Sequence, residues 1–303
     1  MEYGRIISES FRISWRYKSL WVFGLFAGAG GSGFHFDDSW FEKQDLGFDL
    51  EEFFQTWDIS FDWHLLIPIA VAFTIMGLAF TIMHLISVPA LIDGINKIKR
   101  GGSYRLGSSF SVGIDFFWRF FGLSVIAVVV IFGAIITAVA FGFFAYAIHW
   151  AILVFYILLM IPLFFGFTFV AGSVFELATR AMVVRDIGVF DSIHEGYLLL
   201  RRNLGSNFLM CLIYMGLSMG LGLGALLIWA MVGGPIALIA LATGLGILPA
   251  IILAVIMGLP ISLIVGGFIG TVVESLYTLF YFELVEPGGL SKPASAASAT
   301  PLA

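Results

Sequence analysis

The sequence predicts an all-α, polytopic membrane protein, and three observations lead to this prediction. Residues 203–273 contain no charged side chain. Similar apolar runs occupy Leu65–Ile92 and Leu123–Phe175, the second interrupted only by His149. The chain is 60% hydrophobic and 12% charged, whereas soluble domains carry about a quarter charged residues. A transmembrane helix needs roughly 20 apolar residues, so these runs predict several spans within one integral membrane domain, residues 1–286.

Basic residues set the predicted orientation, because Lys and Arg are concentrated in the cytoplasmic loops of membrane proteins. Fourteen of the fifteen basic residues fall into four clusters. The clusters are Arg5, Arg12, Arg16 and Lys18; Lys97, Lys99, Arg100, Arg105 and Arg119; Arg180, Arg185, Arg201 and Arg202; and Lys292. Residues 31–63 contain only Lys43 among nine acids. We therefore expect both termini in the cytoplasm, segment 34–63 outside, and turns at His149-Trp150 and Gly233–Pro235.

This orientation requires six crossings, and one of them is weak. The apolar part of the first crossing, residues 19–33, is short for a span. We expect its helix to begin near Tyr3 as an amphipathic segment whose basic side chains reach the headgroups. The alternative is a re-entrant segment with an external N-terminus.

A shift of 83 residues aligns two regions of the chain without a gap and predicts a repeated unit. The aligned pairs include Asp93 with Glu176, Lys97 with Arg180, Ser109 with Ser192, Gly113 with Gly196, and Arg119 with Arg202. The N-terminus resembles a third copy. We predict three units of about 3–99, 106–184 and 189–285, each an interfacial helix followed by a transmembrane hairpin. The interfacial helices are expected at Tyr3–Lys18, Leu106–Trp118 and Val189–Asn203. Repeats of this kind mark some transporters but also arise by duplication of a stable hairpin.

Two of the units carry insertions that we expect on the outside. In segment 34–63, an i, i+3, i+4, i+7 apolar pattern predicts a short helix that lies on the membrane or caps the bundle. That pattern is formed by Leu50, Phe53, Phe54 and Trp57. Segment 233–248, next to Pro235, favours a re-entrant or tilted half-helix, with a seventh span as the alternative. The tail, residues 287–303, has the composition of a disordered segment.

Three acids lie at the inner ends of predicted spans and form a candidate intramembrane ionisable site. Asp93 and Glu176 are each followed four residues later by a base, Lys97 and Arg180, which is the spacing of helix-surface ion pairs. Glu274 has Thr278 in that place. We considered a buried pair of Glu274 with His84 that takes up and releases a proton, because ionisable groups in a span are functional candidates.

Glycines at four-residue spacing predict close contacts between helices. They form two ridges: Gly216, Gly220 and Gly224, and Ser262, Gly266 and Gly270. Small residues let helix backbones approach closely in lipid. The contacts are either internal or between copies of the chain.

Two stretches carry a resemblance to a known group. Residues 10–25, SFRISWRYKSLWVFGL, and residues 180–205, from Arg180 through Gly205, resemble uncharacterised bacterial multi-pass membrane proteins. Those proteins are similar to the membrane domain attached to some glycerophosphoryl diester phosphodiesterases. The resemblance implies a six-span fold of repeated hairpins in a bacterial inner membrane. It implies no catalysis, because the phosphodiesterase chemistry belongs to a separate soluble domain.

Motifs for hydrolases, phosphate loops and Cys/His metal sites are absent from the sequence. We therefore expect no enzyme activity, cofactor, metal or nucleic-acid partner. The expected function is that of a scaffold or accessory subunit, in contact with the lipid bilayer and with a membrane-protein partner or other copies of itself. The alternative is a transporter or channel for an ion, proton or lipophilic solute, built around His84 and Glu274.

Overall fold

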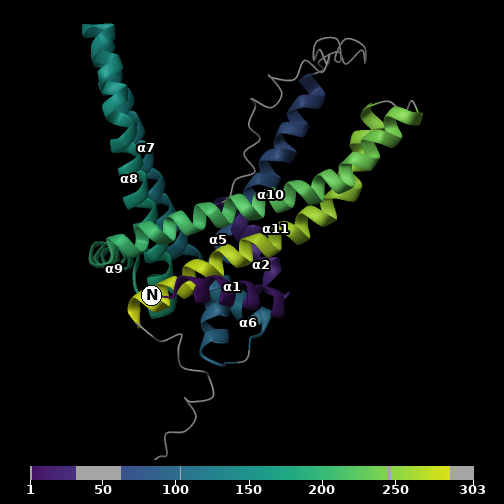
Figure 1. Cartoon of the computed structure of the whole chain (residues 1–303), viewed down its shortest axis with the longest axis horizontal. Helices are drawn as coiled ribbons and strands as arrows, with labels where there is room; N and C mark the ends of the chain where they lie inside the picture. Colours follow the sequence, from purple (N-terminus) through teal and green to yellow (C-terminus); the bar gives the residue numbers. More distant parts are fainter. Residues whose placement is uncertain (1, 32–62, 103, 244–246, 287–303) are drawn as a thin grey trace, which may run out of the picture.

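The computed structural model describes residues 2–31, 63–102, 104–243 and 247–286, and within them the chain forms nine helices (Figure 1). They are α1 (Tyr3–Arg16), α2 (Leu20–Gly31), α5 (Trp63–Lys99), α6 (Leu106–Asp115), α7 (Phe117–Ile148), α8 (Trp150–Arg185), α9 (Val189–Arg202), α10 (Leu204–Thr243) and α11 (Ile247–Val285). The all-helical prediction is confirmed. The acidic segment 34–63, except Trp63, and the tail lie outside the described residues.

Five of the described helices are long and apolar enough to cross a membrane. The candidate spans are Ala70–Lys99, Phe117–Ile148, Trp150–Arg185, Leu204–Ile236 and Ile256–Val285. The sixth predicted span is represented by α2, whose 12 residues extend for about 18 Å. That length is well below the ~30 Å of hydrocarbon in a bilayer. The described part of the chain therefore contains five helices that could span a membrane, instead of the six predicted.

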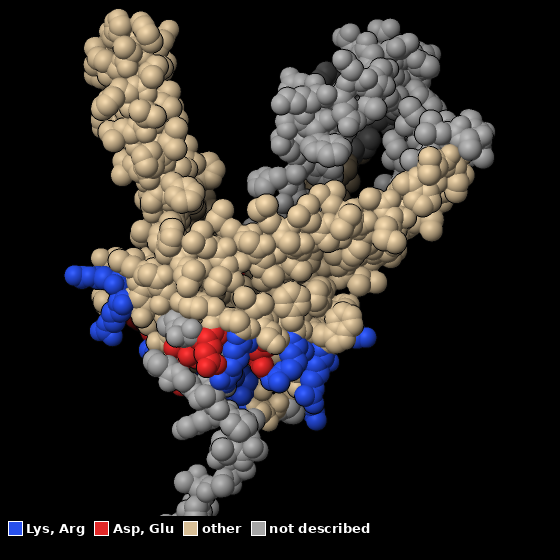
Figure 2. Space-filling view, viewed as in Figure 1, with Lys and Arg blue, Asp and Glu red and all other residues tan. Residues whose placement is uncertain are grey.

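The helices share a common base and diverge from it (Figure 1). The short helices α1, α6 and α9 lie at this base. Their bounds are close to those of the predicted interfacial helices. From the base, the hairpin of α7 and α8 extends in one direction and that of α10 and α11 in another. Charged side chains gather at the base, and the extending helices are apolar (Figure 2). The base is therefore the polar end of the molecule.

The hydrophobic core lies at the base, where the ends of the long helices meet the short ones. Its fully buried apolar side chains include Ile6, Leu20, Leu91, Met182, Leu200 and Leu276. Serines accompany them on α1, where the Ser10 and Ser14 hydroxyls each donate to the carbonyl oxygen four residues earlier, at 2.8 Å. These internal hydrogen bonds satisfy the hydroxyls without a partner helix, so small polar residues can be buried there.

A glycine seam joins α2 to α11, and we define it as Gly24 and Gly28 on α2 with Gly267 and Gly270 on α11. A Cβ atom built on Gly24 would lie 2.7 Å from the Thr271 backbone nitrogen. One built on Gly270 would overlap the Gly24 carbonyl oxygen. The two backbones are thus in direct contact, as small-residue ridges permit in membranes. The predicted Ser262–Gly266–Gly270 ridge makes this contact through Gly270.

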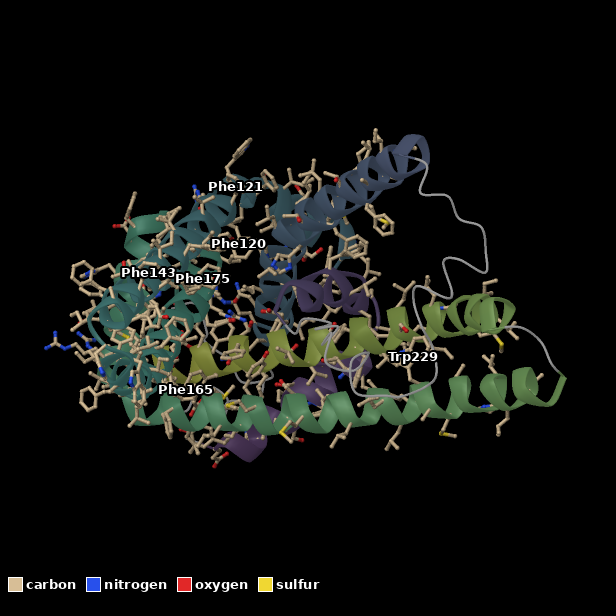
Figure 3. All side chains as sticks on the ribbon, turned by 90° about the horizontal axis from the view of Figure 1, so that it is seen from above. Phe120, Phe121, Phe143, Phe165, Phe175 and Trp229 are labelled. Carbon is tan, nitrogen blue, oxygen red and sulfur yellow. The ribbon has the colours of Figure 1, made fainter. Side chains whose placement is uncertain are left out.

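The glycines of the other predicted ridge contact no other helix in the part of the chain that the structure describes. A Cβ atom on Gly216, Gly220 or Gly224 would meet no atom within 4 Å outside its own helix backbone. Aromatic rings fill the contact between α10 and α11 instead. Trp229 lies between the two helices against Gly258 (Figure 3), and the rings of Tyr214 and Tyr277 have centroids 5.3 Å apart. Of the two kinds of contact expected for this ridge, the internal one is therefore not found among the described residues, and the contact between copies stays a prediction.

Segment 233–248 also differs from its prediction. Helix α10 continues through Gly233, Gly234 and Pro235 to Thr243, and α11 begins at Ile247. The chain therefore does not turn at Gly233–Pro235, and residues 233–243 continue α10 instead of forming a separate half-helix or a seventh span. Proline is tolerated within transmembrane helices. The turn predicted at His149-Trp150 is confirmed, since His149 Nδ1 accepts a hydrogen bond from the Ala151 amide at 3.2 Å.

Candidate functional site

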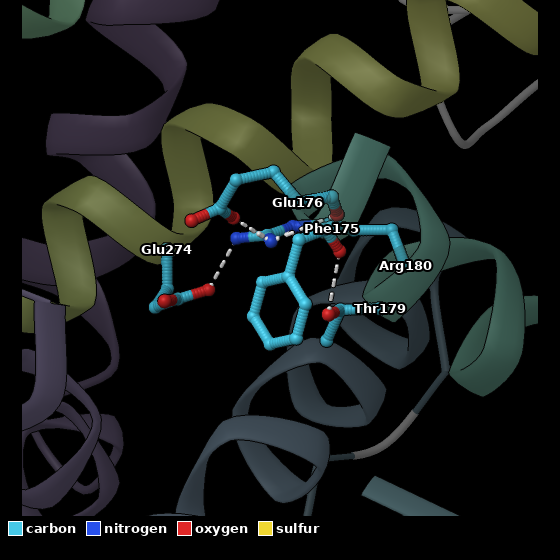
Figure 4. A network of polar contacts seen from close by, with 5 residues as sticks. All are labelled: Phe175, Glu176, Thr179, Arg180 and Glu274. Atoms are coloured by element: carbon cyan, nitrogen blue, oxygen red, sulfur yellow. Dashed lines mark hydrogen bonds and ion pairs between the residues drawn. The ribbon is translucent and has the colours of Figure 1, made fainter. Parts of the chain in front are cut away.

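A buried arginine at the base end of α8 is the centre of a polar cluster that joins α8 to α11 (Figure 4). The Arg180 side chain is 2% exposed. Its Nη2 lies 2.5 Å from Glu274 Oε2 on α11, and its Nη1 is paired with the Glu176 carboxylate one turn earlier on α8. Nη1 also lies 3.0 Å from the Glu176 carbonyl oxygen. We call Glu176, Arg180 and Glu274 the base triad.

The surroundings of the base triad explain why it forms. A buried guanidinium is costly unless it is paired and hydrogen-bonded, and here two carboxylates from two helices surround it. The Arg180 Cζ atom also lies 5.2 Å from the centre of the Tyr277 ring, which adds a cation–π contact. Glu274 is 14% exposed and Glu176 is 35% exposed. The cluster therefore ties α8 to α11 at the edge of the core.

Glu274 does not pair with His84, so that part of the predicted ionisable site is wrong. His84 Nδ1 lies 2.8 Å from the Phe26 carbonyl oxygen. A carbonyl can only accept, so the imidazole donates this bond and ties α5 to α2. Arg180 takes the place that we assigned to His84 beside Glu274. The sequence suggests Arg180 only as the partner of Glu176, because its second carboxylate lies 94 residues further along the chain.

Asp93 belongs to a second cluster at the base end of α5. Its Oδ2 accepts hydrogen bonds from Lys97 Nζ at 2.6 Å and from the Ser109 hydroxyl of α6 at 2.9 Å. The Lys97 contact has the predicted i,i+4 spacing, and the Ser109 contact adds a link between α5 and α6. Tyr104 packs beside Gly94 in the loop before α6, and burial raises the pKa of its hydroxyl.

Further ion pairs around α9 were not predicted from the sequence. Arg185 lies 2.7 Å from Glu195, which also contacts the Tyr281 hydroxyl at 3.4 Å. Arg119 of α7 lies 2.5 Å from Asp186, the left-handed residue that ends α8. These partners lie on different helices, and nothing in their spacing along the sequence signals a contact. Glu195 thus links α9 to Arg185 of α8 and Tyr281 of α11, and the Arg119–Asp186 pair links α7 to the end of α8.

A surface hollow of about 370 Å³ lies beside these pairs. Its lining residues are Arg185, Ile187, Asp191, His194, Glu195, Leu198, Leu199 and Arg202. The acids and arginines of the lining are equal in number, so their charges balance. Within the described residues no group of three His, Cys, Asp or Glu side chains is placed to hold a metal ion. The charged groups in these clusters at the base thus form ion pairs, some within one helix and some between helices.

Comparisons with known proteins identify no relative. No protein-family model, curated protein or solved structure matches the chain.

Proposed function

We propose that this multi-pass membrane protein is a non-enzymatic scaffold or accessory subunit of a membrane complex. The observation that carries the proposal is the hairpin of α7 and α8. In the most apolar stretches of these two helices, 6% and 0% of residues are buried within the chain. Phe143 and Phe165 are 74% and 65% exposed (Figure 3). A hairpin that is anchored only at its base leaves two apolar faces for the helices of a partner.

The base triad weighs against the transport alternative. A transport site needs ionisable groups that can exchange a bound ion or proton. Here Glu274 and Glu176 share Arg180, Asp93 binds Lys97, and His84 binds a carbonyl group. All four candidate residues thus have protein partners. Proteoliposome flux that is lost in the Glu274→Gln variant would favour transport over a scaffold.

Photo-crosslinking in native membranes tests the scaffold proposal. We expect a photoreactive amino acid at Phe143 or Phe165 to yield one discrete protein adduct. The same partner should co-purify in fixed stoichiometry in mild detergent. The matched control is Phe73 on α5, an exposed phenylalanine of another span. Lipid adducts alone at Phe143 and Phe165, or identical adducts at all three positions, would contradict the proposal.

The same proposal includes the repeated architecture, six crossings and the resemblance to the phosphodiesterase-associated membrane domain. Packing at two of the short helices supports the repeat. A Cβ atom on Gly113 of α6 would overlap the Ile86 carbonyl oxygen of α5. A Cβ atom on Gly196 of α9 would lie 2.7 Å from the Val174 carbonyl oxygen of α8. The two aligned glycines thus each face the backbone of the long helix that precedes them.

Cysteine labelling tests the proposed orientation, in which both termini are cytoplasmic and the membrane is a bacterial inner membrane. In a Cys211→Ser background, we expect a membrane-impermeant reagent on intact cells to label Ser39→Cys and to spare Ser103→Cys. The physical reason is the asymmetry of Lys and Arg. Labelling of Ser103→Cys before cell lysis would contradict this topology. Labelling of both positions after lysis is the control for accessibility.

A further inference from the structure

Helix α1 and the corner between α1 and α2 carry four basic residues, and only two of them are neutralised by ion pairs within the described residues. Arg5 lies 3.3 Å from Glu2, and Arg12 lies 2.5 Å from Glu9. Arg16 and Lys18 follow at the end of α1, and both are exposed. Within the described residues neither of them has an ion-pair partner. The two free charges therefore lie together at one end of the helix.

Aromatic residues fix this corner against a membrane-spanning helix. Trp15 is 66% exposed, yet one edge of its ring packs on Phe268 of α11 at a centroid distance of 6.0 Å. Trp21 packs on the same ring at 5.6 Å, and its indole nitrogen donates to the Ser14 carbonyl oxygen at 2.8 Å. The direction of the chain between α1 and α2 is thus set by a hydrogen bond and by a shared aromatic contact.

The combination of an exposed tryptophan and free cations is typical of the membrane–water interface. Tryptophan is enriched there because its ring is apolar and its N–H is polar. α1 packs on α11 at the base (Figure 1), and charged groups gather on that side (Figure 2). Arg16 also lies in the last turn of α1, where the helix dipole favours a cation. Lys18 lies beyond the helix and has no such role.

We propose that Trp15, Arg16 and Lys18 form a binding site for an anionic phospholipid of the leaflet that contains α1. The two cations take the phosphodiester group from two sides, and the exposed face of Trp15 lies along the upper part of the acyl chains. An acidic polypeptide would pair with the two cations but would leave the apolar Trp15 ring exposed to water. The lipid matches both the charges and the ring.

Lipid binding to the full chain in detergent tests this site. Native mass spectrometry would count bound phosphatidylglycerol and phosphatidylcholine on the wild type and on the Arg16→Gln/Lys18→Gln variant. Each basic residue near a membrane surface contributes roughly 1 kcal/mol of attraction to anionic lipid. We therefore expect the variant to lose phosphatidylglycerol affinity by about ten- to thirtyfold, with phosphatidylcholine binding unchanged. The Trp15→Ala variant should weaken the binding of both lipids.

The matched control is Arg201→Gln/Arg202→Gln, which removes two exposed charges from the last turn of α9. We expect it to keep phosphatidylglycerol affinity within about twofold of the wild type, and circular dichroism would verify that both variants remain helical. Equal losses in the two double variants would mean attraction by net charge alone and would overturn the proposal. Unchanged binding in the α1 variant, or displacement of the lipid by soluble polyglutamate, would also overturn it.

Discussion

Replacing Arg180 with methionine is expected to destabilise the protein by about 3–5 kcal/mol, because the change leaves two carboxylates beside each other without their cation. Arg180 is almost fully buried, and it is the only group that joins Glu176 to Glu274 in the described structure. The loss should be measured as a lower free energy of unfolding in mixed micelles. We also expect α8 and α11 to separate at the base, which a distance measurement between spin labels on the two helices would detect.

Two further variants make the Arg180 prediction specific. The Glu176→Gln/Arg180→Met/Glu274→Gln triple variant removes every charge of the base triad and should recover most of the lost stability, because no unpaired carboxylate remains. Arg119→Met breaks an exposed pair with Asp186 and should cost at most about 1 kcal/mol. An Arg180→Met variant as stable as Arg119→Met would show that the triad contributes little to the packing of the base.

A methyl group added to the glycine seam should be the second most damaging change. In Gly270→Ala the new Cβ would overlap the Gly24 carbonyl oxygen, and a backbone atom cannot rotate away as a side chain can. Separating α2 from α11 also loosens the aromatic contacts of Trp21 with Phe268. We expect a loss of about 3 kcal/mol, at the upper end of the usual cost of overpacking. Thermal unfolding in detergent would measure it.

The ridge of Gly216, Gly220 and Gly224 on α10 supplies a control in which the same kind of substitution is not expected to lower the stability. Gly220 has no neighbour within 4 Å of an added Cβ, and alanine favours a helix interior by about 0.5–1 kcal/mol over glycine. Gly220→Ala should therefore be neutral or slightly stabilising for the monomer. Equal destabilisation by Gly220→Ala and Gly270→Ala would mean that the seam is no tighter than the ridge on α10.

Much of the helix layout could be predicted from the sequence because hydropathy and periodicity are local properties. The short helices begin at the predicted Tyr3, Leu106 and Val189, and they end within three residues of the predicted positions. The exceptions involve glycine and proline. Gly233–Pro235 has the composition of a turn in water, but in α10 it lies inside an apolar helix of 40 residues. In lipid, the loss of backbone hydrogen bonds at a turn costs more than the presence of a proline in a helix.

The candidate site was only partly predictable because its contacts join distant parts of the chain. The spacing of Asp93 and Lys97 suffices to predict their pair. Spacing carries no information about the second carboxylate of Arg180 or about the Phe26 carbonyl beside His84. Likewise, two ridges with the same glycine spacing have different surroundings. The glycines of α11 form a close contact because α2 lies against them, and the spacing within α11 does not show this.

The length of the hairpin of α10 and α11 has a mechanical consequence. Its helices contain 40 and 39 residues, or about 60 Å each, which is twice the ~30 Å of hydrocarbon in a bilayer. Excess length of this size is accommodated by tilting or by extending beyond the hydrocarbon. If tilt alone accommodated it, the helices would lie at about 60° to the membrane normal, with the far end of the hairpin some 50 Å to the side of the base. In that case the tilt angle would follow the thickness of the membrane, decreasing in a thicker bilayer and increasing in a thinner one.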